Sequence, residues 1–446
     1  MIKTLRNIFA AASVLLVISC SNDDYLNVIP NESIAIASID LTQNKQYCND
    51  GDENTFMEIS GIDDFSKCGI DISSKIFAFE TSDGTIGLVA HVEDADAVTK
   101  QFENLHSKGK CSSPEQHRGN TFVMIGNSWL AGYSDEALII IGPITTMQKN
   151  ATEQRMIGMF SQDEENSFRN SKLFEKLDSI DAPVSLVAQI SALPEQFSLP
   201  FSAGMPKDAD LSQVILYAGM KREGNLAVIR GNTFSFNYKI NNELKENDKA
   251  FRPVTGDMLD NLPANCIGYM FMNARGEHLL KVMQQNRNVQ PLLAGANTAV
   301  DIDKILRSIN GNMLFSLQNL TGDFNFKARL AKKDFLSDVG YWKSSCPAGS
   351  RIIDNGKDSY IYIGKDMKYY FSVSSDNMFI SSLQQGKEDT GMEKTPSFAL
   401  PKDVRSKVVG SRFAMLFYTD RISNDAFAGI IRFLTGGATN ILYIKE

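Results

Sequence analysis

One stretch of apolar sequence occurs twice in this chain, and this repetition constrains the fold more than any other feature. The first copy, Ile29–Leu41, has the sequence IPNESIAIASIDL, and the second, Leu262–Asn273, has the sequence LPANCIGYMFMN. A shift of 233 residues aligns Pro30 with Pro263. Each copy therefore begins with a proline turn, continues as an apolar strand, and ends on a side chain that can cap a helix.

Further matches follow the first in the same order along the chain. A shift of 238 residues aligns 76–79 with 314–317, 86–90 with 324–328 and 122–126 with 360–364, and a shift of 241 aligns 134–139 with 375–380. Collinear matches with a nearly constant shift predict an internal duplication. The competing explanation is that α+β domains share generic strand–turn–strand patterns.

Strand patterns outnumber helix patterns in both halves, and most strands follow one another through tight turns. One example is Leu226–Ile240, which we interpret as a hairpin that turns at Gly231-Asn232. Such chains form antiparallel sheets with helices packed on one face, so the predicted fold class is α+β. The predicted parts are a signal peptide (1–19), a lipidated cysteine with its tether (20–28), a first repeat half (29–241), a linker (242–261) and a second half that is shorter at its C-terminal end (262–446).

The N-terminal segment has the composition of a targeting signal and not of a folded part. Lys3 and Arg6 give it a positive start, and the apolar run Ile8–Ile18 is too short to span a bilayer. The segment ends in Val17-Ile18-Ser19-Cys20, which resembles a bacterial lipobox. We therefore expect cleavage before Cys20 and its lipidation, for example with palmitate, which anchors a protein without a transmembrane helix. A plain secretory signal with an incidental cysteine is the alternative.

Two acidic residues, Asp23 and Asp24, lie shortly after Cys20. They resemble the surface-export signal of Bacteroidetes lipoproteins, whereas a solvated linker explains the same composition. The expected location is the outer membrane, and the face of that membrane on which the protein lies is left open.

The formal net charge of −8 over 446 residues excludes two classes of partner. Proteins that bind nucleic acid need a basic surface that displaces counterions from phosphates, and adhesion to anionic lipids needs one too. The N-terminal lipid is therefore the only membrane contact that we expect. A protein or glycan partner is left open.

Five cysteines remain if Cys20 carries lipid: Cys48, Cys68, Cys111, Cys266 and Cys346. An odd number leaves at least one thiol without a disulfide partner. Cys48 and Cys68 bracket one polar segment and can bridge in an oxidising compartment. The pairing is not determined by the sequence.

No motif for catalysis or metal binding is complete. The four histidines lack a second ligand at helical or strand spacing; they are His91, His106, His117 and His278. We expect His91 on a solvated face of its sheet. Asp50–Asn54 imitates the start of a calcium loop but lacks the glycine and glutamate that complete one, and Ser375-Asp376-Asn377 is interpreted as a turn. We assign no catalytic, metal-binding or cofactor-binding residue and expect no cofactor.

The lipobox, the acidic pair and the repeated proline–strand–cap units together resemble the uncharacterised duplicated lipoproteins of Bacteroidetes, a family of unknown function. The resemblance implies a location and an architecture, and it transfers no catalytic residue. The favoured function is a non-enzymatic binding or scaffold role. The alternative is an envelope hydrolase or glycan-processing enzyme, which a pair of carboxylates in one pocket with one raised pKa would favour.

Overall fold

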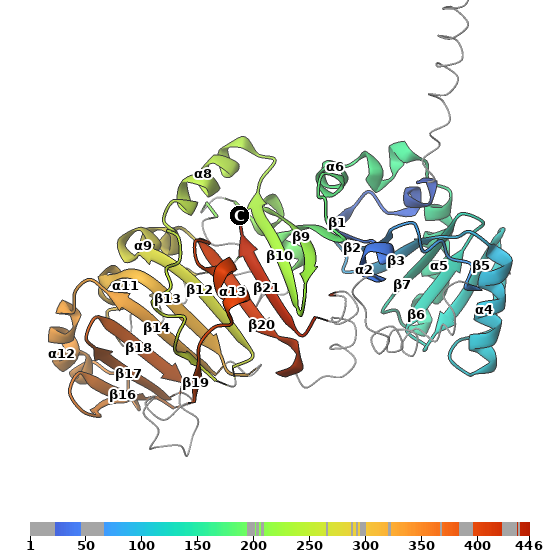
Figure 1. Ribbon diagram of the computed structural model, residues 1–446. Helices are drawn as coiled ribbons and strands as arrows, with labels where there is room; N and C mark the ends of the chain where they lie inside the picture. The colour runs from blue at the N-terminus through green and yellow to red at the C-terminus, as the bar shows by residue number, and fades with distance from the viewer. Residues whose placement is uncertain are drawn as a thin grey trace, which may run out of the picture. The chain divides into compact units, whose positions relative to one another are not determined.

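The computed structural model divides the chain into two compact units (Figure 1). Unit 1 holds residues 1–42 and 57–179, and unit 2 holds residues 43–56 and 180–446. The structure describes residues 23–45, 67–193, 201, 205–206, 209–264, 266–286, 289–290, 293–294, 300–319, 323–365, 368–382, 396–421, 435 and 438–446.

Unit 1 is built on an antiparallel sheet in the order β1-β2-β3-β7-β6-β5-β4. Its strands are β1 (Ser33–Ile39), β2 (Ile76–Thr81), β3 (Ile86–His91), β4 (Glu115–His117), β5 (Asn120–Ile125), β6 (Trp129–Tyr133) and β7 (Ala137–Gly142). Its α-helices are α4 (Ala95–Ser107), α5 (Lys149–Phe160) and α6 (Lys172–Asp178), and α2 (Leu41–Lys45) follows β1. The 3-10 turns of unit 1 are η1 (Asp24–Val28), η3 (Thr146–Gln148), η4 (Glu164–Asn166) and η5 (Phe168–Asn170).

The helix α4 covers one face of this sheet. Asp94 caps the helix by accepting a hydrogen bond from the Ala97 amide at 3.0 Å. Val98, Phe102 and Leu105 recur at helical spacing and pack on the sheet with Val123, Ala131 and Tyr133. The apolar stripe of α4 therefore faces the core.

The opposite face is covered partly by η1, which falls inside the predicted tether. Tyr25, Leu26 and Val28 are buried, and η1 packs against β3, β7 and α5. Burying these apolar side chains lowers the free energy of the folded state, because it removes apolar surface from water. The tether predicted over 20–28 thus overlaps the folded unit, which includes Asp24–Val28.

Unit 2 is built on a longer sheet in the order β8-β9-β10-β21-β20-β12-β13-β14-β18-β17-β16-β15. Its pairs are antiparallel except β10 with β21, which is parallel. The strands are β8 (Val184–Gln189), β9 (Ile215–Glu223), β10 (Leu226–Phe234), β12 (Gly268–Arg275), β13 (Ile309–Leu317), β14 (Phe324–Leu330), β15 (Arg351–Asp354), β16 (Ser359–Ile363), β17 (Lys368–Ser374), β18 (Asn377–Ser382), β20 (Phe413–Tyr418) and β21 (Asn440–Lys445). A separate pair joins β11 (Leu262–Pro263) to β19 (Ser397–Phe398).

Helices cover both faces of this sheet. They are α8 (Tyr238–Asp248), α9 (Gly276–Gln285), α11 (Ile302–Ser308), α12 (Val339–Ser344) and α13 (Lys402–Val408), with 3-10 turns η6 (Ile190–Ala192), η7 (Leu211–Gln213), η8 (Asp334–Asp338) and η10 (Thr419–Arg421). Figure 1 shows α9, α11 and α12 along one side of β12–β18, where Phe335 and Trp342 enter the core. On the other side, Val404 and Val408 of α13 pack over the central strands. The fold is α+β with a large antiparallel sheet, as predicted, but the helices lie on both faces of the sheet and not on the single face that we expected.

The two sheets share a strand order. The series β12-β13-β14-β18-β17-β16-β15 repeats the connectivity of β1-β2-β3-β7-β6-β5-β4, and each series has a helical segment after its third strand in the chain. The predicted halves and the compact units nevertheless divide the chain differently. Strands β8, β9 and β10 belong to unit 2, and the segment predicted as a linker (242–261) includes the end of α8.

The residue-level matches between the repeats are less accurate than the strand order. If Val89 and Lys327 are equivalent, as the shift of 238 requires, their partners Phe77 and Leu314 differ by 237 residues and not by the predicted 238. The pairs Val89–Ile139 and Lys327–Phe379 likewise give 240 in place of 241. A slip of one residue reverses the two faces of a strand. Because β2, β7, β13 and β18 carry apolar residues on both faces, the sequence pattern could not detect the slip.

Candidate functional site

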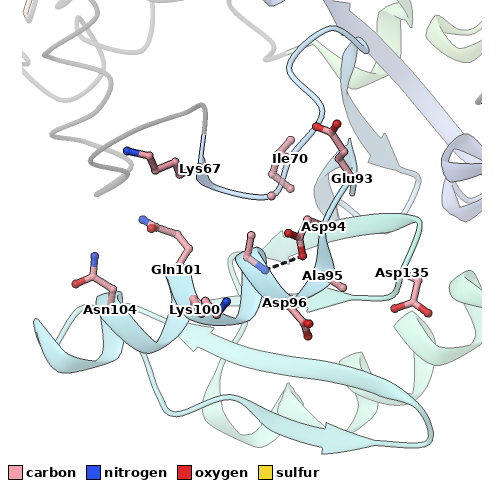
Figure 2. Close-up of a pocket in the computed structure, with 12 residues that line it drawn as sticks. Lys67, Ile70, Glu93, Asp94, Ala95, Asp96, Lys100, Gln101, Asn104 and Asp135 are labelled. Atoms are coloured by element: carbon pink, nitrogen blue, oxygen red, sulfur yellow. Dashed lines mark hydrogen bonds between the residues drawn. The ribbon is translucent and has the colours of Figure 1, made fainter.

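A pocket of about 1050 Å³ lies in unit 1 at the start of α4 (Figure 2). We call it the acidic pocket, and its lining residues are Lys67, Gly69, Ile70, Glu93, Asp94, Ala95, Asp96, Ala97, Lys100, Gln101, Asn104 and Asp135. They come from the segment before β2, from α4 and from the β6–β7 turn. The volume is at the upper end of what small-ligand sites occupy.

Gly69 holds the backbone of the acidic pocket in place. Its carbonyl oxygen accepts hydrogen bonds from the amides of Glu93 at 2.9 Å and Asp94 at 3.1 Å. Its φ is +80°, and a Cβ at this position would lie 2.3 Å from the Asp94 carbonyl oxygen. Only glycine combines that conformation with so close an approach, so this residue fixes the segment before β2 against the helix.

Charge is distributed unevenly around the acidic pocket. Figure 2 shows the carboxylates of Glu93, Asp96 and Asp135 towards one side, Lys67 and Gln101 towards the other, and Lys100 between Gln101 and Asp96. Within the part of the chain that the structure describes, those three carboxylates form no side-chain hydrogen bond or ion pair. Asp96 lies in the first turn of α4, where the helix dipole favours a negative charge. The positions of Glu93 and Asp135 have no such explanation.

Most of the polar groups in the lining are charged or are amides. Its side chains offer carboxylates, ammonium groups and amides, and they include no histidine, cysteine, serine or tyrosine. Nucleophilic and general-base catalysis ordinarily need one of those groups or a carboxylate held by an oriented partner. The acidic pocket can therefore hold a charged ligand, and its lining provides no assembled nucleophile and base.

A second group of polar side chains, which we call the histidine cluster, consists of His91 of β3 together with Asp71 and Ser74 from the segment before β2. His91 is 9% exposed, so the expected solvated position is wrong. Its Nδ1 lies 3.0 Å from Asp71 Oδ2, which also accepts a hydrogen bond from the Ser74 hydroxyl at 2.6 Å. Although burial opposes it, hydrogen bonds from Ser73, Ser74 and His91 hold the pKa of Asp71 well below its usual range.

This cluster has the residue types of a serine hydrolase triad but not the geometry. The Ser74 hydroxyl lies 3.5 Å from His91 Nδ1, the nitrogen that already faces Asp71. A triad places serine and aspartate on opposite ring nitrogens. Tyr25 of η1 lies over the imidazole, with ring centroids 5.2 Å apart, and its hydroxyl donates to the Lys75 carbonyl at 2.7 Å. The cluster joins η1 to the sheet.

The other histidines also have structural contacts. His117 lies on β4 with its Nδ1 3.1 Å from Oε2 of the buried Glu153. His106 lies in the last turn of α4, and its Nδ1 lies 3.0 Å from the Cys111 carbonyl. His278 lies at the start of α9. No group of three or more potential metal ligands occurs among the described residues.

The predicted site residues lie at the edge of the described chain. Cys20 falls outside it, as do Cys48 and the calcium-like stretch Asp50–Asn54. Asp23 precedes η1, and Asp24 is its first residue, 3.5 Å from Arg169 Nη1. Asp23 and Asp24 do not line the acidic pocket, and the roles of Cys20 in lipidation and of Asp23 and Asp24 in export stay predictions.

The remaining cysteines do not form a cluster. Cys111, Cys266 and Cys346 carry free thiols, and Cys68 is buried. Burial raises the pKa of the Cys111 and Cys266 thiols, which makes them poor nucleophiles.

The acidic pocket was not predicted from the sequence. The signals were present as Glu93–Asp96 at a helix start and as the turn that contains Asp135, but each is an ordinary helix or turn signature. The carboxyl whose pKa burial does raise, Glu80, lies on β2 and does not line this pocket.

Comparison with known proteins places the chain in a family. A model described as Domain of unknown function (DUF4836) matches residues 46–398, and the chain belongs to that family. No curated protein matches. Among the described residues, no helix has the length and apolar character needed to cross a bilayer.

Solved structures of one other protein, TP0453, show a distant likeness. Crystal form I shares 7% identity at a TM-score of 0.28, covering 80% of this chain and 91% of that one. Crystal form III shares 9% at 0.27 (80% and 93%), and crystal form IV shares 12% at 0.27 (44% and 75%). At such TM-scores the likeness carries no argument about fold or function.

Proposed function

We propose that this protein is an envelope lipoprotein, anchored through Cys20, that binds a basic segment of another protein in the acidic pocket. One observation carries the proposal: Glu93, Asp96 and Asp135 share one side of the pocket and have no cation of their own within the described chain. Like charges held together raise the energy of the free protein. A ligand that supplies cations relieves this repulsion, so binding is favoured without any chemical step.

The location and the origin of the chain are part of the same proposal. The lipobox-like Val17–Cys20 and the acidic Asp23 and Asp24 support an outer-membrane lipoprotein of the Bacteroidetes type. The shared strand order of the two sheets supports an internal duplication. In this proposal the second series of strands has diverged more at the residue level than in its connectivity.

Isothermal titration of the purified full-length chain in detergent with a ten-residue lysine peptide tests the pocket. The variant Glu93→Gln/Asp96→Asn/Asp135→Asn should weaken binding at least about tenfold, equivalent to about 1.4 kcal/mol. It should also flatten the salt dependence, because fewer screened charge pairs form.

A matched control removes the same charge elsewhere on unit 1. Glu103→Gln/Glu175→Gln/Asp178→Asn alters three exposed carboxylates that do not line the pocket. This variant should change binding less than about twofold. Equal losses in both variants would show that net charge alone attracts the peptide, and the acidic pocket would then not be the site. Turnover of glycans, peptides or esters by the purified chain would overturn the non-enzymatic role.

A further inference from the structure

A second pocket, of about 390 Å³, lies in unit 2 on the sheet face opposite α12. We call it the polar pocket, and its lining residues are Asn261, Pro263, Leu314, Ser316, Asn325, Lys327, Ser372, Ser374, Ser375, Asn377, Phe379 and Ser397. Its floor consists of β13, β14, β18 and β17, and Pro263 and Ser397 belong to the β11–β19 pair. A floor of paired strands holds its side chains in fixed positions.

The lining of the polar pocket is rich in hydroxyl and amide groups and poor in charge. Serine and asparagine side chains both donate and accept hydrogen bonds. Of those in the lining, only Asn325 forms a side-chain hydrogen bond within the described residues, accepting from the Ser381 hydroxyl at 2.8 Å. A pocket of alternating donors and acceptors matches the hydroxyl groups of a sugar.

Ser316 gives independent support for a ligand. It is fully buried, and its hydroxyl has no hydrogen-bond partner in the described structure. Its neighbour across the β13–β14 pair is Asn325, whose amide is engaged by Ser381. Buried polar groups are almost always paired, because an unpaired one loses its bonds to water without replacement. A ligand hydroxyl at the bottom of the pocket supplies the missing partner.

Lys327 indicates the charge of that ligand. It is half-buried between Leu314 and Phe379, its neighbours on the adjacent strands. The next position of β14 on this face, Arg329, has its own counter-ion in Asp257 at 3.1 Å. Lys327 has none among the described residues, and no carboxylate lines the pocket. A half-buried ammonium group without a counter-ion favours an anionic ligand.

We propose that the polar pocket binds a sugar unit that carries one carboxylate, with Lys327 recognising the acid and Ser316 a hydroxyl. Leu314, Pro263 and Phe379 provide apolar surface for the carbon face of the ring. The volume suits one or two sugar rings. The lining contains no aspartate, glutamate, histidine or cysteine, so the site binds the sugar and does not cleave it. This site is separate from the acidic pocket and does not depend on the function proposed for it.

Titration of the full-length chain with galacturonic acid, galactose and acetate tests this proposal. Lys327→Met should weaken galacturonate binding at least about tenfold, equivalent to about 1.4 kcal/mol, and leave the weaker galactose binding unchanged. Lys365→Met, an exposed lysine outside the lining, is the matched control and should alter neither. Ser316→Ala should weaken both sugars by a similar factor, and it should keep or raise the melting temperature because it removes an unpaired buried hydroxyl.

Each part of the experiment has an outcome that would contradict the proposal. Galactose binding as tight as galacturonate, or acetate binding as tight as either, would overturn the acidic-sugar assignment. A loss of galacturonate binding that Lys365→Met reproduces would exclude Lys327 as its contact. Unaltered sugar binding in the Glu93→Gln/Asp96→Asn/Asp135→Asn variant is expected, and a loss there would place the sugar in the acidic pocket instead.

Discussion

Gly69 and Gly84 share a left-handed backbone conformation but differ in their surroundings. Gly69 has φ +80° and backbone atoms of Asp94 and Val98 where a Cβ would go, whereas Gly84 has φ +79° and open space. Gly69→Ala should therefore destabilise unit 1 by the conformational cost of about 1 kcal/mol plus a steric cost of a further ~1–3 kcal/mol. Gly84→Ala should show only the conformational cost of about 1 kcal/mol.

Urea unfolding in a Trp342→Phe background measures this difference. That background leaves Trp129 of unit 1 as the only tryptophan, so its fluorescence reports on unit 1. Equal losses for the two alanine variants would mean that the segment before β2 moves away from α4 at no cost. The acidic pocket would then be less rigid than the hydrogen bonds of Gly69 indicate.

Asp71 links the stability of unit 1 to pH. Its pKa is lowered in the folded state, so its contribution is complete above its unfolded pKa of about 4 and is lost as the pH falls further. Asp71→Asn should cost about 1–3 kcal/mol at pH 7, and the gap to the wild type should narrow below about pH 4. The same fluorescence assay at several pH values measures it. As a control, Asp135→Asn, at an exposed carboxylate without a partner, should change stability by less than about 0.5 kcal/mol. A stability difference between wild type and Asp71→Asn that widens in acid would contradict the role assigned to Asp71.

At the scale of the element, η1 contributes buried apolar side chains to unit 1. Leu26 is 4% exposed, whereas the side chain of Asp24 in the same turn is 75% exposed. Leu26→Ala should cost about 2–5 kcal/mol by leaving a cavity, and Asp24→Asn should cost less than about 1 kcal/mol because its ion pair is solvated. Thermal unfolding of both variants checks this. A mild effect of Leu26→Ala would mean that η1 is detached from the sheet in solution.

Helices were easier to predict than strand registers. The sequence allows only one placement of α4, because Asp94 marks the start of the helix and the spacing of its apolar residues determines which face packs on the sheet. The turn expected at Gly231-Asn232 is instead inside β10, and the actual turn of this hairpin is at Gly224, which has φ +63°. Gly231 is needed because a Cβ there would lie 2.4 Å from the Tyr217 carbonyl oxygen. A local turn signal cannot distinguish that packing role from a bend.

At the scale of the whole molecule, sequence patterns predicted the fold class but neither pocket. An α+β architecture follows from strand and helix periods that are local. The acidic pocket joins residues from before β2 to Asp135 beyond β6, and the polar pocket joins Asn261 to Ser397. Nothing in a single sequence states which distant polar residues meet. The isolated cation Lys327 became visible only when its cross-strand neighbours were known to be apolar.

The proposed lipid anchor on Cys20 would determine how close the described chain lies to a membrane. Between Cys20 and the described chain at Asp23 only Ser21 and Asn22 intervene, a span of at most roughly 11 Å. A lipid on Cys20 would therefore hold unit 1 against the bilayer surface, with η1 nearest to the attachment point. Because Asp24→Asn is expected to cost little stability, the proposed role of Asp24 in export can be tested separately from folding.

Cys20→Ala, expressed in the native host with a labelled fatty acid, tests the anchor. The wild-type chain should take up label and sediment with membranes, because two or more acyl chains bind far more strongly than one, and Cys20→Ala should do neither. Asp23→Asn/Asp24→Asn should keep the label while losing accessibility to protease added to intact cells, if these residues direct export. Label retained by Cys20→Ala would exclude this cysteine as the anchor. Unchanged protease accessibility in the asparagine variant would exclude the acidic pair as the signal.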